Sequence, residues 1–417
     1  MSRIFADLTP LRESPPFRRL WIGHSVGTAG QQMTSVAVAL EVYDLTGSSW
    51  SVGLTGLFQL VPLVVLGLYG GALLDRFDRR RVALIATSGL WASTLAFVIQ
   101  SLAGADSVAL LYAIIAVQSG FFAVANPARQ AIIPRLVPLH LLPAANALNT
   151  LTWGLAFTIG PVLAGFLIAG TGTVTTVYLI DLVVFGIAVW AMWRLPSMPP
   201  EGVAPDAARG WKSVLEGIRF LKGKRNLQMS FYLDIVAMVF GMPRALFPAI
   251  ATAWYGGSLA DVALIVGLLS AAPAVGSIVA TVLSGPLGRV RRQGLAVVIS
   301  ICIWGGAIAV FGLVRALPVA LVLLAIAGGA DSVSAIFRST ILQAATPDDY
   351  RGRLQGIFTV VVVGGPRLGD VEAGGVAELF GETVSAVSGG LLCLVFTGAL
   401  VAAVPTFLRY DAEHPVP

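Results

Sequence analysis

The stretch Gly70-Gly-Ala-Leu-Leu-Asp75-Arg-Phe-Asp78-Arg-Arg-Arg81 separates two long apolar segments of the chain. The first apolar segment ends in paired glycines, and small residues of this kind let membrane helices approach one another closely. Two carboxylates and four arginines follow before the next apolar segment begins. Short loops rich in arginine stay on the cytoplasmic side of a membrane. The stretch therefore predicts a cytoplasmic turn between two membrane-spanning helices.

The composition extends this prediction to the whole chain. Of 417 residues, 56% are hydrophobic and only 12% are charged, with a mean hydropathy of +0.84. Soluble domains carry about 25% charged residues, so the sequence predicts a polytopic protein whose main partner is the lipid bilayer. The two cysteines lie in apolar segments and offer no basis for a metal site or a disulfide framework. Loop arginines account for the basic pI near 9.5, so we expect no nucleic-acid partner.

Twelve segments have the length and apolar character of a membrane-spanning helix, which needs about 20 residues. The predicted spans are 18–43, 49–73, 82–103, 107–129, 144–169, 174–194, 228–255, 260–285, 294–314, 318–339, 354–379 and 385–408. If the N-terminus is cytoplasmic, the inner loops hold nearly all the loop arginines and lysines, and the outer loops hold essentially Arg315 alone. This asymmetry predicts that both termini are cytoplasmic.

The spans fall into two sets of six. We expect an N-terminal bundle over 1–194, a linker over 195–227 and a C-terminal bundle over 228–417. Within the linker, residues 211–225 place apolar side chains at helical spacing among basic ones, which predicts a short helix on the inner membrane surface. A solvated linker is the alternative.

The two halves also repeat. Arg129 to Gly165 aligns without a gap on Arg338 to Gly374, with a constant shift of 209 residues. In this alignment Arg129 meets Arg338 and Gly160 meets Gly369. A duplicated six-helix unit is typical of transporters that bind substrate where the two repeats meet.

The opening stretch resembles the loop between helices two and three of the major facilitator superfamily. Its matching residues, the candidate conformational motif, are Gly71, Asp75, Arg76, Arg79 and Arg80. Thr346-Pro-Asp-Asp-Tyr-Arg-Gly-Arg-Leu354 resembles the loop between helices ten and eleven of bacterial exporters in that superfamily. The resemblance implies an all-α membrane protein with twelve transmembrane helices in two pseudo-symmetric bundles. Asp78 stands where many members have glycine, which is similar to the enterobactin-exporter and drug:proton antiporter branch. A basic loop that anchors any polytopic protein is the alternative interpretation.

The fifth predicted span contains Gly160-Pro161-Val-Leu-Ala-Gly165, which resembles the antiporter motif of the same superfamily. Proline removes a backbone donor and kinks a helix, while the small residues permit tight packing against a moving neighbour. An ordinary proline kink with small-residue packing is the alternative.

Charged residues inside predicted spans are the main candidates for function, because an unpaired ion in hydrocarbon is costly. The eleventh span carries Arg367, Asp370 and Glu372. Arg367 and Asp370 are three residues apart on one helix face and can pair locally. We interpret the three as groups for substrate recognition or proton coupling; a structural ion pair is the alternative. Asp331 and Arg338 lie on one face of the tenth span, where Arg338 can serve simply as an anchor.

Further candidates follow from the resemblance, because helices one, four, seven and ten line the central cavity in this superfamily. It implies that Asp234, Arg244 and Asp331 are wall residues. The amides of Gln31 and Gln118 are uncharged candidates for binding substrate, although amides also join neighbouring helices. His24 and Asp181 rank below these.

The sequence contains no phosphate-binding loop, no zinc-protease motif and no nucleophile elbow. We therefore expect no enzymatic activity, no cofactor and a proton gradient as the energy source. The resemblance implies export of a small organic molecule, such as a siderophore or a hydrophobic drug, in exchange for protons across a bacterial cytoplasmic membrane. A proton-coupled importer and a non-transporting sensor or scaffold are the alternatives. We expect a monomer, and the sequence identifies no export partner.

Overall fold

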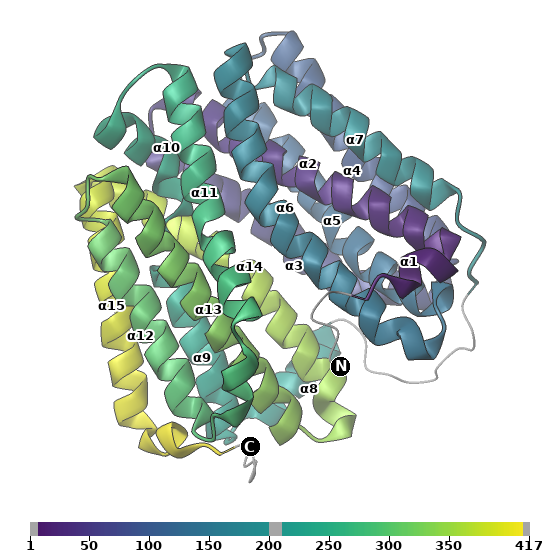
Figure 1. Ribbon diagram of the computed structural model, residues 1–417, viewed down its shortest axis with the longest axis vertical. Helices are drawn as coiled ribbons and strands as arrows, with labels where there is room; N and C mark the ends of the chain where they lie inside the picture. Colours follow the sequence, from purple (N-terminus) through teal and green to yellow (C-terminus); the bar gives the residue numbers. More distant parts are fainter. Residues whose placement is uncertain (1–6, 200–210, 412–417) are drawn as a thin grey trace. The chain divides into compact units, whose positions relative to one another are not determined.

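The computed structural model describes residues 7–199 and 211–411, and Figure 1 shows that the chain is built of helices. The first half contains α1 (Thr9–Glu13), α2 (Pro15–Thr46), α3 (Ser49–Arg76), α4 (Arg79–Leu102), α5 (Val108–Leu136), η1 (Leu139–Leu141), α6 (Leu142–Thr171) and α7 (Thr175–Trp193). The second half contains α8 (Trp211–Leu221), α9 (Arg225–Phe240), η2 (Arg244–Leu246), α10 (Phe247–Ile250), η3 (Ala251–Tyr255), α11 (Leu259–Val282), η4 (Gly285–Arg289), α12 (Gln293–Phe311), α13 (Leu317–Ala345), α14 (Asp348–Phe380), α15 (Glu382–Ala403) and η5 (Pro405–Arg409).

The described residues form 10 segments that are long and apolar enough to cross a membrane. Two further helices, α2 and α14, coincide with predicted spans and are 32 and 33 residues long, but both are more polar than these segments. Large apolar side chains such as Ile85, Val183 and Val395 are exposed along the apolar helices. Exposed apolar surface on this scale suits a bilayer as solvent. The chain is a multi-pass membrane protein.

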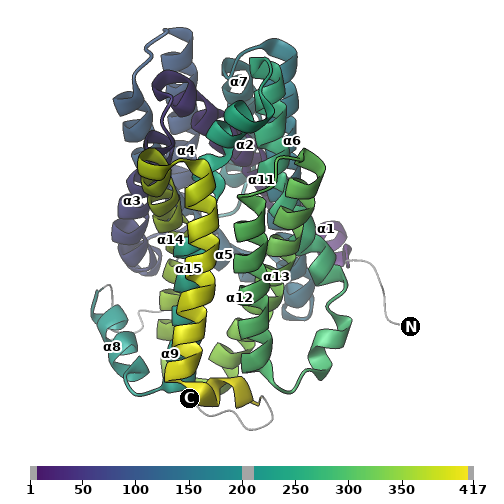
Figure 2. The ribbon, with the colours of Figure 1, turned by 90° about the vertical axis from the view of Figure 1, so that its left-hand side faces the viewer.

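The helices cluster into two compact units. The first consists of residues 1–45, 58–209 and 258–267, and the second of 46–57, 210–257 and 268–417. In the first unit, α4 packs against α5 and α7, and a core cluster includes Phe17, Ala83, Ile132 and Leu148. In the second unit, α12 packs against α13 and α15, and α9 packs against α14, as Figure 1 and Figure 2 show.

The internal repeat appears as matching close contacts between helices. A Cβ atom on Gly160 would lie 2.8 Å from the carbonyl oxygen of Ala29 in α2, and one on Gly369 would lie 2.2 Å from that of Met238 in α9. Ala29 and Met238 are separated by the same 209 residues as the two glycines. The α2–α6 contact in the first unit is therefore repeated as the α9–α14 contact in the second.

The opening turn is closed by Asp78, which caps the N-terminus of α4. Its side chain accepts hydrogen bonds from the backbone N–H of Arg81 at 3.2 Å, from the N–H of Met198 at 3.0 Å and from the Ser197 hydroxyl. The φ angle of Asp78 is −53°, so the turn does not use the left-handed backbone that glycine favours. An aspartate fits here because a capping acceptor is required.

The arginines of the turn bind the backbone of neighbouring helices. Arg79 donates to the carbonyl of Ala131 in α5, and Arg80 donates to that of Trp193 at the end of α7. Arg76 lies over the ring of Phe77. The expectations for Gly71 and Asp75 concern side-chain surroundings that fall outside the described residues.

We expect Asp78→Ala to destabilise the first unit by about 1 kcal/mol, the usual worth of a helix cap. Partial burial raises the pKa of the Asp78 carboxyl, but the hydrogen bonds from Ser197, Arg81 and Met198 outweigh it, so that the pKa lies below its ordinary value. A lowered folded-state pKa stabilises the protein above the ordinary carboxyl pKa, and this contribution is lost as the pH falls through the folded-state value.

Melting temperatures of the purified protein at neutral and acid pH test this prediction. The difference between wild type and Asp78→Ala should be present at neutral pH and shrink in acid. Asp78→Asn, which keeps a capping oxygen, should lose less stability than the alanine variant. An alanine variant that melts like wild type at neutral pH would show that the cap contributes nothing.

The seventh predicted span is not one continuous helix. It is interrupted between α9 and η2 at Gly241-Met242-Pro243, and it ends in the π-helical turn η3. Glycine is a poor helix former and proline lacks a backbone donor, so the pair stops α9. The predicted span over 228–255 corresponds to the apolar segment Arg225–Tyr255, which consists of α9, η2, α10 and η3. Residues 211–221 do form a helix, α8, as the apolar spacing predicted.

Candidate functional site

The second unit contains a buried cluster of one arginine and two carboxylates. Arg338 in α13 forms an ion pair with Asp234 in α9. It forms a second, at 3.5 Å, with Asp331, which lies about two turns earlier in α13. The Arg338 and Asp234 side chains are 3% and 2% exposed, whereas Asp331 is 36% exposed. The cluster thus reaches from a fully buried ion pair to a partly accessible carboxylate.

Two carboxylates around one arginine leave an excess of negative charge inside the unit. The Oδ2 atom of Asp234 is buried without a hydrogen-bond partner among the described residues. Removing an ion from water costs several kcal/mol unless it is paired and hydrogen-bonded. A proton on one carboxylate would cancel the excess, so the arrangement suits reversible protonation.

A second ion pair joins Arg244 and Asp370. The distance between Arg244 Nη2 and Asp370 Oδ2 is 2.7 Å, and the two side chains are 43% and 13% exposed. Arg244 lies in η2, directly after the break that ends α9. The break therefore places an arginine beside α14 that a continuous helix would carry elsewhere.

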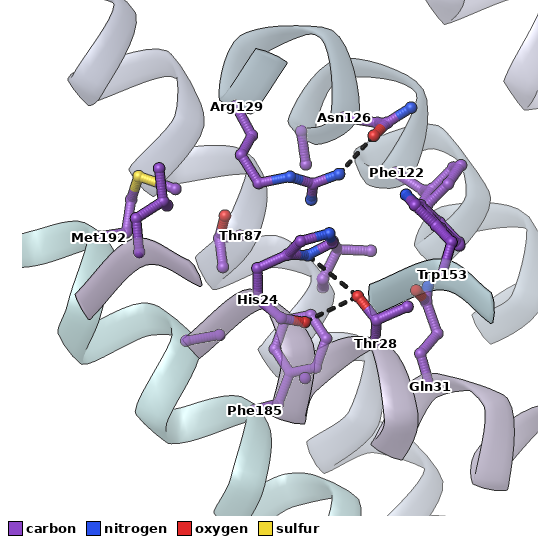
Figure 3. A pocket seen from close by; sticks show the side chains of 15 residues that line it. His24, Thr28, Gln31, Thr87, Phe122, Asn126, Arg129, Trp153, Phe185 and Met192 are labelled. Carbon is purple, nitrogen blue, oxygen red and sulfur yellow. Dashed lines mark hydrogen bonds between the residues drawn. The ribbon is translucent and has the colours of Figure 1, made fainter. Parts of the chain in front are cut away.

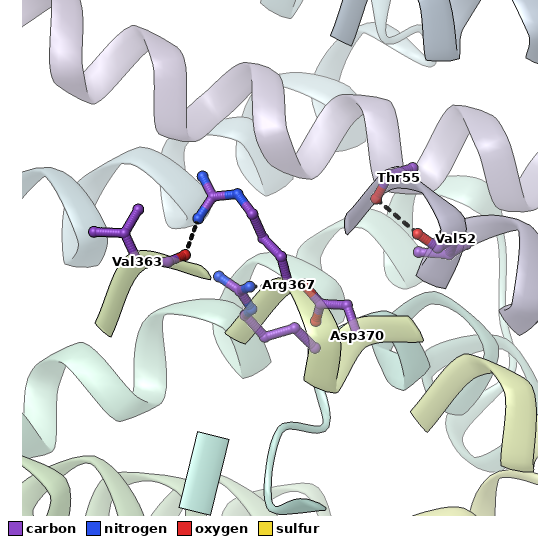
Figure 4. Close-up of polar contacts among 6 residues, drawn as sticks. Val52, Thr55, Val363, Arg367 and Asp370 are labelled. Atoms are coloured by element: carbon purple, nitrogen blue, oxygen red, sulfur yellow. Dashed lines mark hydrogen bonds and ion pairs between the residues drawn. The ribbon is translucent and has the colours of Figure 1, made fainter. Parts of the chain in front are cut away.

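The expected local pair between Arg367 and Asp370 does not form. Arg367 instead donates to the carbonyl oxygen of Val363 one turn earlier in α14, as Figure 4 shows. Asp370 instead accepts a hydrogen bond from the guanidinium of Arg244. Arg367 keeps its Nε atom buried without a partner among the described residues. The described residues therefore hydrogen-bond its guanidinium only in part.

Glycines hold α14 close to its neighbours around this pair. A Cβ on Gly369 would meet α9, and Cβ atoms on Gly53 and Gly56 would lie 2.4 Å from the carbonyl oxygens of Asp370 and Arg367. Gly53 and Gly56 belong to the first turns of α3, which cluster with the second unit. The charged part of α14 is thus fixed by backbone contacts on two sides.

Glu372 lies two residues beyond Asp370 and is partly buried. No polar partner for its side chain is found within residues 7–199 and 211–411. It stays a candidate for proton binding.

The antiporter-like residues Gly160, Pro161 and Gly165 make close contacts in the first unit. Gly160 contacts α2, and the other two contact the start of α11. A Cβ on Gly165 would lie 2.8 Å from the carbonyl oxygen of Ala263.

The first unit also contains a partly open cavity, shown in Figure 3. Its volume is about 40 Å³, measured as the space open to the centres of water-sized molecules. Side chains from α2, α4, α5, α6 and α7 line it, including His24, Gln31, Asn126, Arg129 and Trp153. Of the two candidate glutamines, Gln31 lines this cavity and Gln118 does not. Gln32 points elsewhere and packs against Gly160.

His24 is buried and held in one orientation within the cavity. The Thr28 hydroxyl donates to the carbonyl oxygen of His24 at 2.7 Å, so its oxygen accepts from the ring Nδ1–H at 3.0 Å. The Nε2 atom is then left without a partner among the described residues. Figure 3 shows the ring between Thr28 and Arg129.

Sequence reasoning missed the importance of two arginines. Arg338 is the centre of the buried cluster rather than an anchor at a helix end, and Arg129 carries the charge of the cavity. The internal repeat, which pairs these two residues, was the available signal. Asp181, ranked low, is fully buried and accepts hydrogen bonds from Thr34 and Thr94. Among the described residues, no group of three or more His, Cys, Asp or Glu could hold a metal ion.

Known proteins resemble the chain along almost its whole length. The sequence profile of the family described as transmembrane secretion effector matches residues 5–414. The chain belongs to the transmembrane secretion effector family. Among relatives of this secretion effector, the enterobactin exporter EntS of Escherichia coli strain K12 is 30% identical over 414 residues, which cover 98% of this chain and 96% of the relative. EntS of Citrobacter koseri is 29% identical over 416 residues, or 99% and 97% of the two chains.

Solved structures place this secretion effector in the major facilitator fold. A mutant of the nucleoside transporter NupG superposes with a TM-score of 0.76 at 13% identity, covering 93% of this chain and all of the other. The D-xylose-proton symporter superposes with a TM-score of 0.70 at 14% identity, covering 95% and 99%. The protein is therefore a membrane transporter of the major facilitator superfamily and not an enzyme.

Proposed function

We propose that the protein is a proton-coupled secondary exporter of a small organic molecule in a bacterial cytoplasmic membrane, with both termini in the cytoplasm. The relatives named enterobactin exporters support export and point to a siderophore as the substrate class. The arginine-rich turn around α3 and α4 supports a cytoplasmic location for that loop. A hydrophobic drug is the second substrate class that the same branch of the superfamily suggests.

The observation that carries the coupling proposal is Arg338 buried between Asp234 and Asp331. A proton that reaches the partly exposed Asp331 changes the charge around Arg338 from an excess of one negative charge to neutrality. That change strengthens the hold of Arg338 on Asp234 and so favours one packing of α9 against α13. A ligand or proton shifts an equilibrium only if it binds the two states differently, and the proposal is that a proton on Asp331 does so through Arg338.

Substrate contact is assigned to the second ion pair. Arg244 is 43% exposed and Arg367 has an unpaired buried Nε atom, so both can donate to a substrate oxygen. A substrate that takes Arg244 from Asp370 would leave that carboxylate ready to accept a proton. Binding of substrate and proton at adjacent groups is a direct way to link the two. Glu372 is a further proton-binding candidate.

Transport into everted membrane vesicles tests the proposal. With an acidic lumen, vesicles that contain the wild-type protein should accumulate iron-free enterobactin or the dye ethidium, because efflux from the cell is uptake into an everted vesicle. Asp234→Asn and Asp370→Asn should each reduce the initial rate by at least about tenfold, as expected for lost charge pairing of roughly 1.4 kcal/mol or more. Asp44→Asn, at an exposed position near the end of α2, is the matched control.

The outcomes separate the alternatives. Accumulation that needs the pH gradient and disappears in the two variants supports proton-coupled export. Loss of preloaded substrate on acidification of the lumen indicates a symporter that works as an importer. If neither probe moves under any gradient, export of these substrate classes is contradicted and a sensor or scaffold becomes the better interpretation.

A further inference from the structure

We propose that the cavity in the first unit is an oxyanion-binding site in which Arg129 and Asn126 donate to the anion and His24 forms part of the wall. It takes a carboxylate-sized group, either as a free anion or as the acidic group of a larger molecule. The proposal goes beyond the export function and does not depend on the direction of transport or on the coupling cluster.

The first argument is a charge without a counter-ion. None of the described residues that line the cavity is an aspartate or glutamate. Arg129 donates to the side-chain oxygen of Asn126, and its Nε atom is buried without a partner among the described residues. A buried cation of this kind costs several kcal/mol unless something neutralises it. An anion in the cavity would do so.

The internal repeat provides a second, independent argument. Arg129 in α5 corresponds to Arg338 in α13, which is neutralised by Asp234 and Asp331. The same shift of 209 residues places Ser25 opposite Asp234 and Phe122 opposite Asp331. The first unit therefore has the arginine but neither of the two carboxylates. A bound anion would take the place that the two carboxylates occupy in the second unit.

The amide of Asn126 also suits an anion. Because Asn126 accepts from Arg129 through Oδ1, its amide N–H groups are left to donate. His24, which is 9% exposed, donates through Nδ1–H to Thr28, so Nε2 of its neutral ring is an unpartnered acceptor and adds no donor for the anion. Charge-assisted hydrogen bonds from a guanidinium to a carboxylate or phosphate are among the strongest in proteins.

The size and lining restrict the ligand. A volume of about 40 Å³ for water-sized centres admits a group of a few atoms, since a single water needs roughly 10–15 Å³ on this measure. The rings of Trp153 and Phe122 flank the polar atoms, and Trp153 contacts the His24 ring edge-on at 5.9 Å. An aromatic carboxylate combines the charge for Arg129 with a flat face for Trp153. Benzoate and inorganic phosphate represent the two sources of an oxyanion.

The test is calorimetric titration of the purified full-length protein in detergent with benzoate, inorganic phosphate and benzamide. Benzamide has the shape of benzoate without its charge. We expect at least one of the two anions to bind and benzamide not to bind. Binding of benzoate alone would identify an acidic group on an aromatic molecule as the ligand, and binding of phosphate alone would identify a free anion. Binding of neither anion, or of benzamide as well as benzoate, would overturn the proposal.

The decisive variant is Asn126→Asp, which places a carboxylate where Arg129 already has a partner. It should weaken anion binding by at least about tenfold and raise the melting temperature without ligand, because the arginine gains an internal counter-ion. A variant that simply fails to fold would melt lower, so the two effects are distinguishable. Arg81→Gln, which removes an exposed arginine, is the control and should bind as wild type does. Unchanged anion affinity in Asn126→Asp would also overturn the proposal.

Discussion

Replacing Arg338 by glutamine is expected to lower the free energy of unfolding by roughly 3–5 kcal/mol and to abolish proton-linked transport. The substitution leaves Asp234 and Asp331 together with no cation, and breaking a buried ion pair at one partner has a cost of this size. Most of this cost arises at Asp234, because its side chain is only 2% exposed and water cannot replace the lost partner. Thermal unfolding of the purified protein measures the first effect and vesicle transport the second.

Two further variants make this prediction specific. Asp234→Asn combined with Arg338→Gln removes both charges of the buried pair, so it should recover much of the stability but not the transport. Arg289→Gln, at an exposed position of the same unit, should change neither. If Arg338→Gln were as stable as wild type, the carboxylates would have to be neutral in the resting protein, and the coupling proposal would need another cation.

Gly369→Ala is expected to have the second-largest effect, about 3 kcal/mol of lost stability, at the high end for overpacking. The added Cβ would lie 2.2 Å from the carbonyl oxygen of Met238 and 2.7 Å from the Cβ of Met242. Backbone on the α9 side cannot rotate away as a side-chain end can, so α14 must shift. The shift would lengthen the 2.7 Å contact between Arg244 and Asp370. We therefore expect transport to fall along with stability.

The control for this substitution is Gly398→Ala in α15, where a Cβ would have no atom within 4 Å. It should leave melting temperature and transport unchanged, or raise stability slightly because alanine favours helix over glycine. The repeat partner Gly160→Ala should behave like Gly369→Ala, since its Cβ would meet α2 at 2.7–2.8 Å. Wild-type melting of both variants would mean that α6 and α14 are less tightly packed than these contacts indicate.

The fold could be predicted from the sequence because a bilayer constrains it so strongly. Each apolar segment must satisfy its own backbone, and helices do this, so the positions of the 10 apolar spans follow from hydropathy, whereas α2 and α14 are more polar. Asp78 shows the limit of the family pattern: it departs from the usual glycine, yet the reason is visible only once Ser197 and Met198 are seen beside it. Contacts between residues so far apart in sequence carry no periodic signal.

The candidate site was harder to predict because the partners in an ion pair depend on which helices pack together. Spacing along α14 allowed Asp370 to pair with Arg367, but the break after Phe240 brought Arg244 closer, and this depends on packing in three dimensions. The contacts of Arg338 could be predicted only in part. Its spacing of seven residues from Asp331 places both on one helix face, but no sequence pattern indicates the pair with Asp234. The repeat alignment was the stronger guide, since it paired Arg129 with Arg338.

Trp153 gives the cavity of the first unit an optical property. Its ring packs edge-on to His24, is stacked with Phe157 at 5.8 Å and contacts Phe122 edge-on at 6.3 Å. Any change of charge or hydration beside His24 therefore acts directly on the indole. A chain in which the other eight of the nine tryptophans are replaced by phenylalanine would emit from this position alone. Its fluorescence would follow the occupancy of the cavity in real time, inside a working membrane.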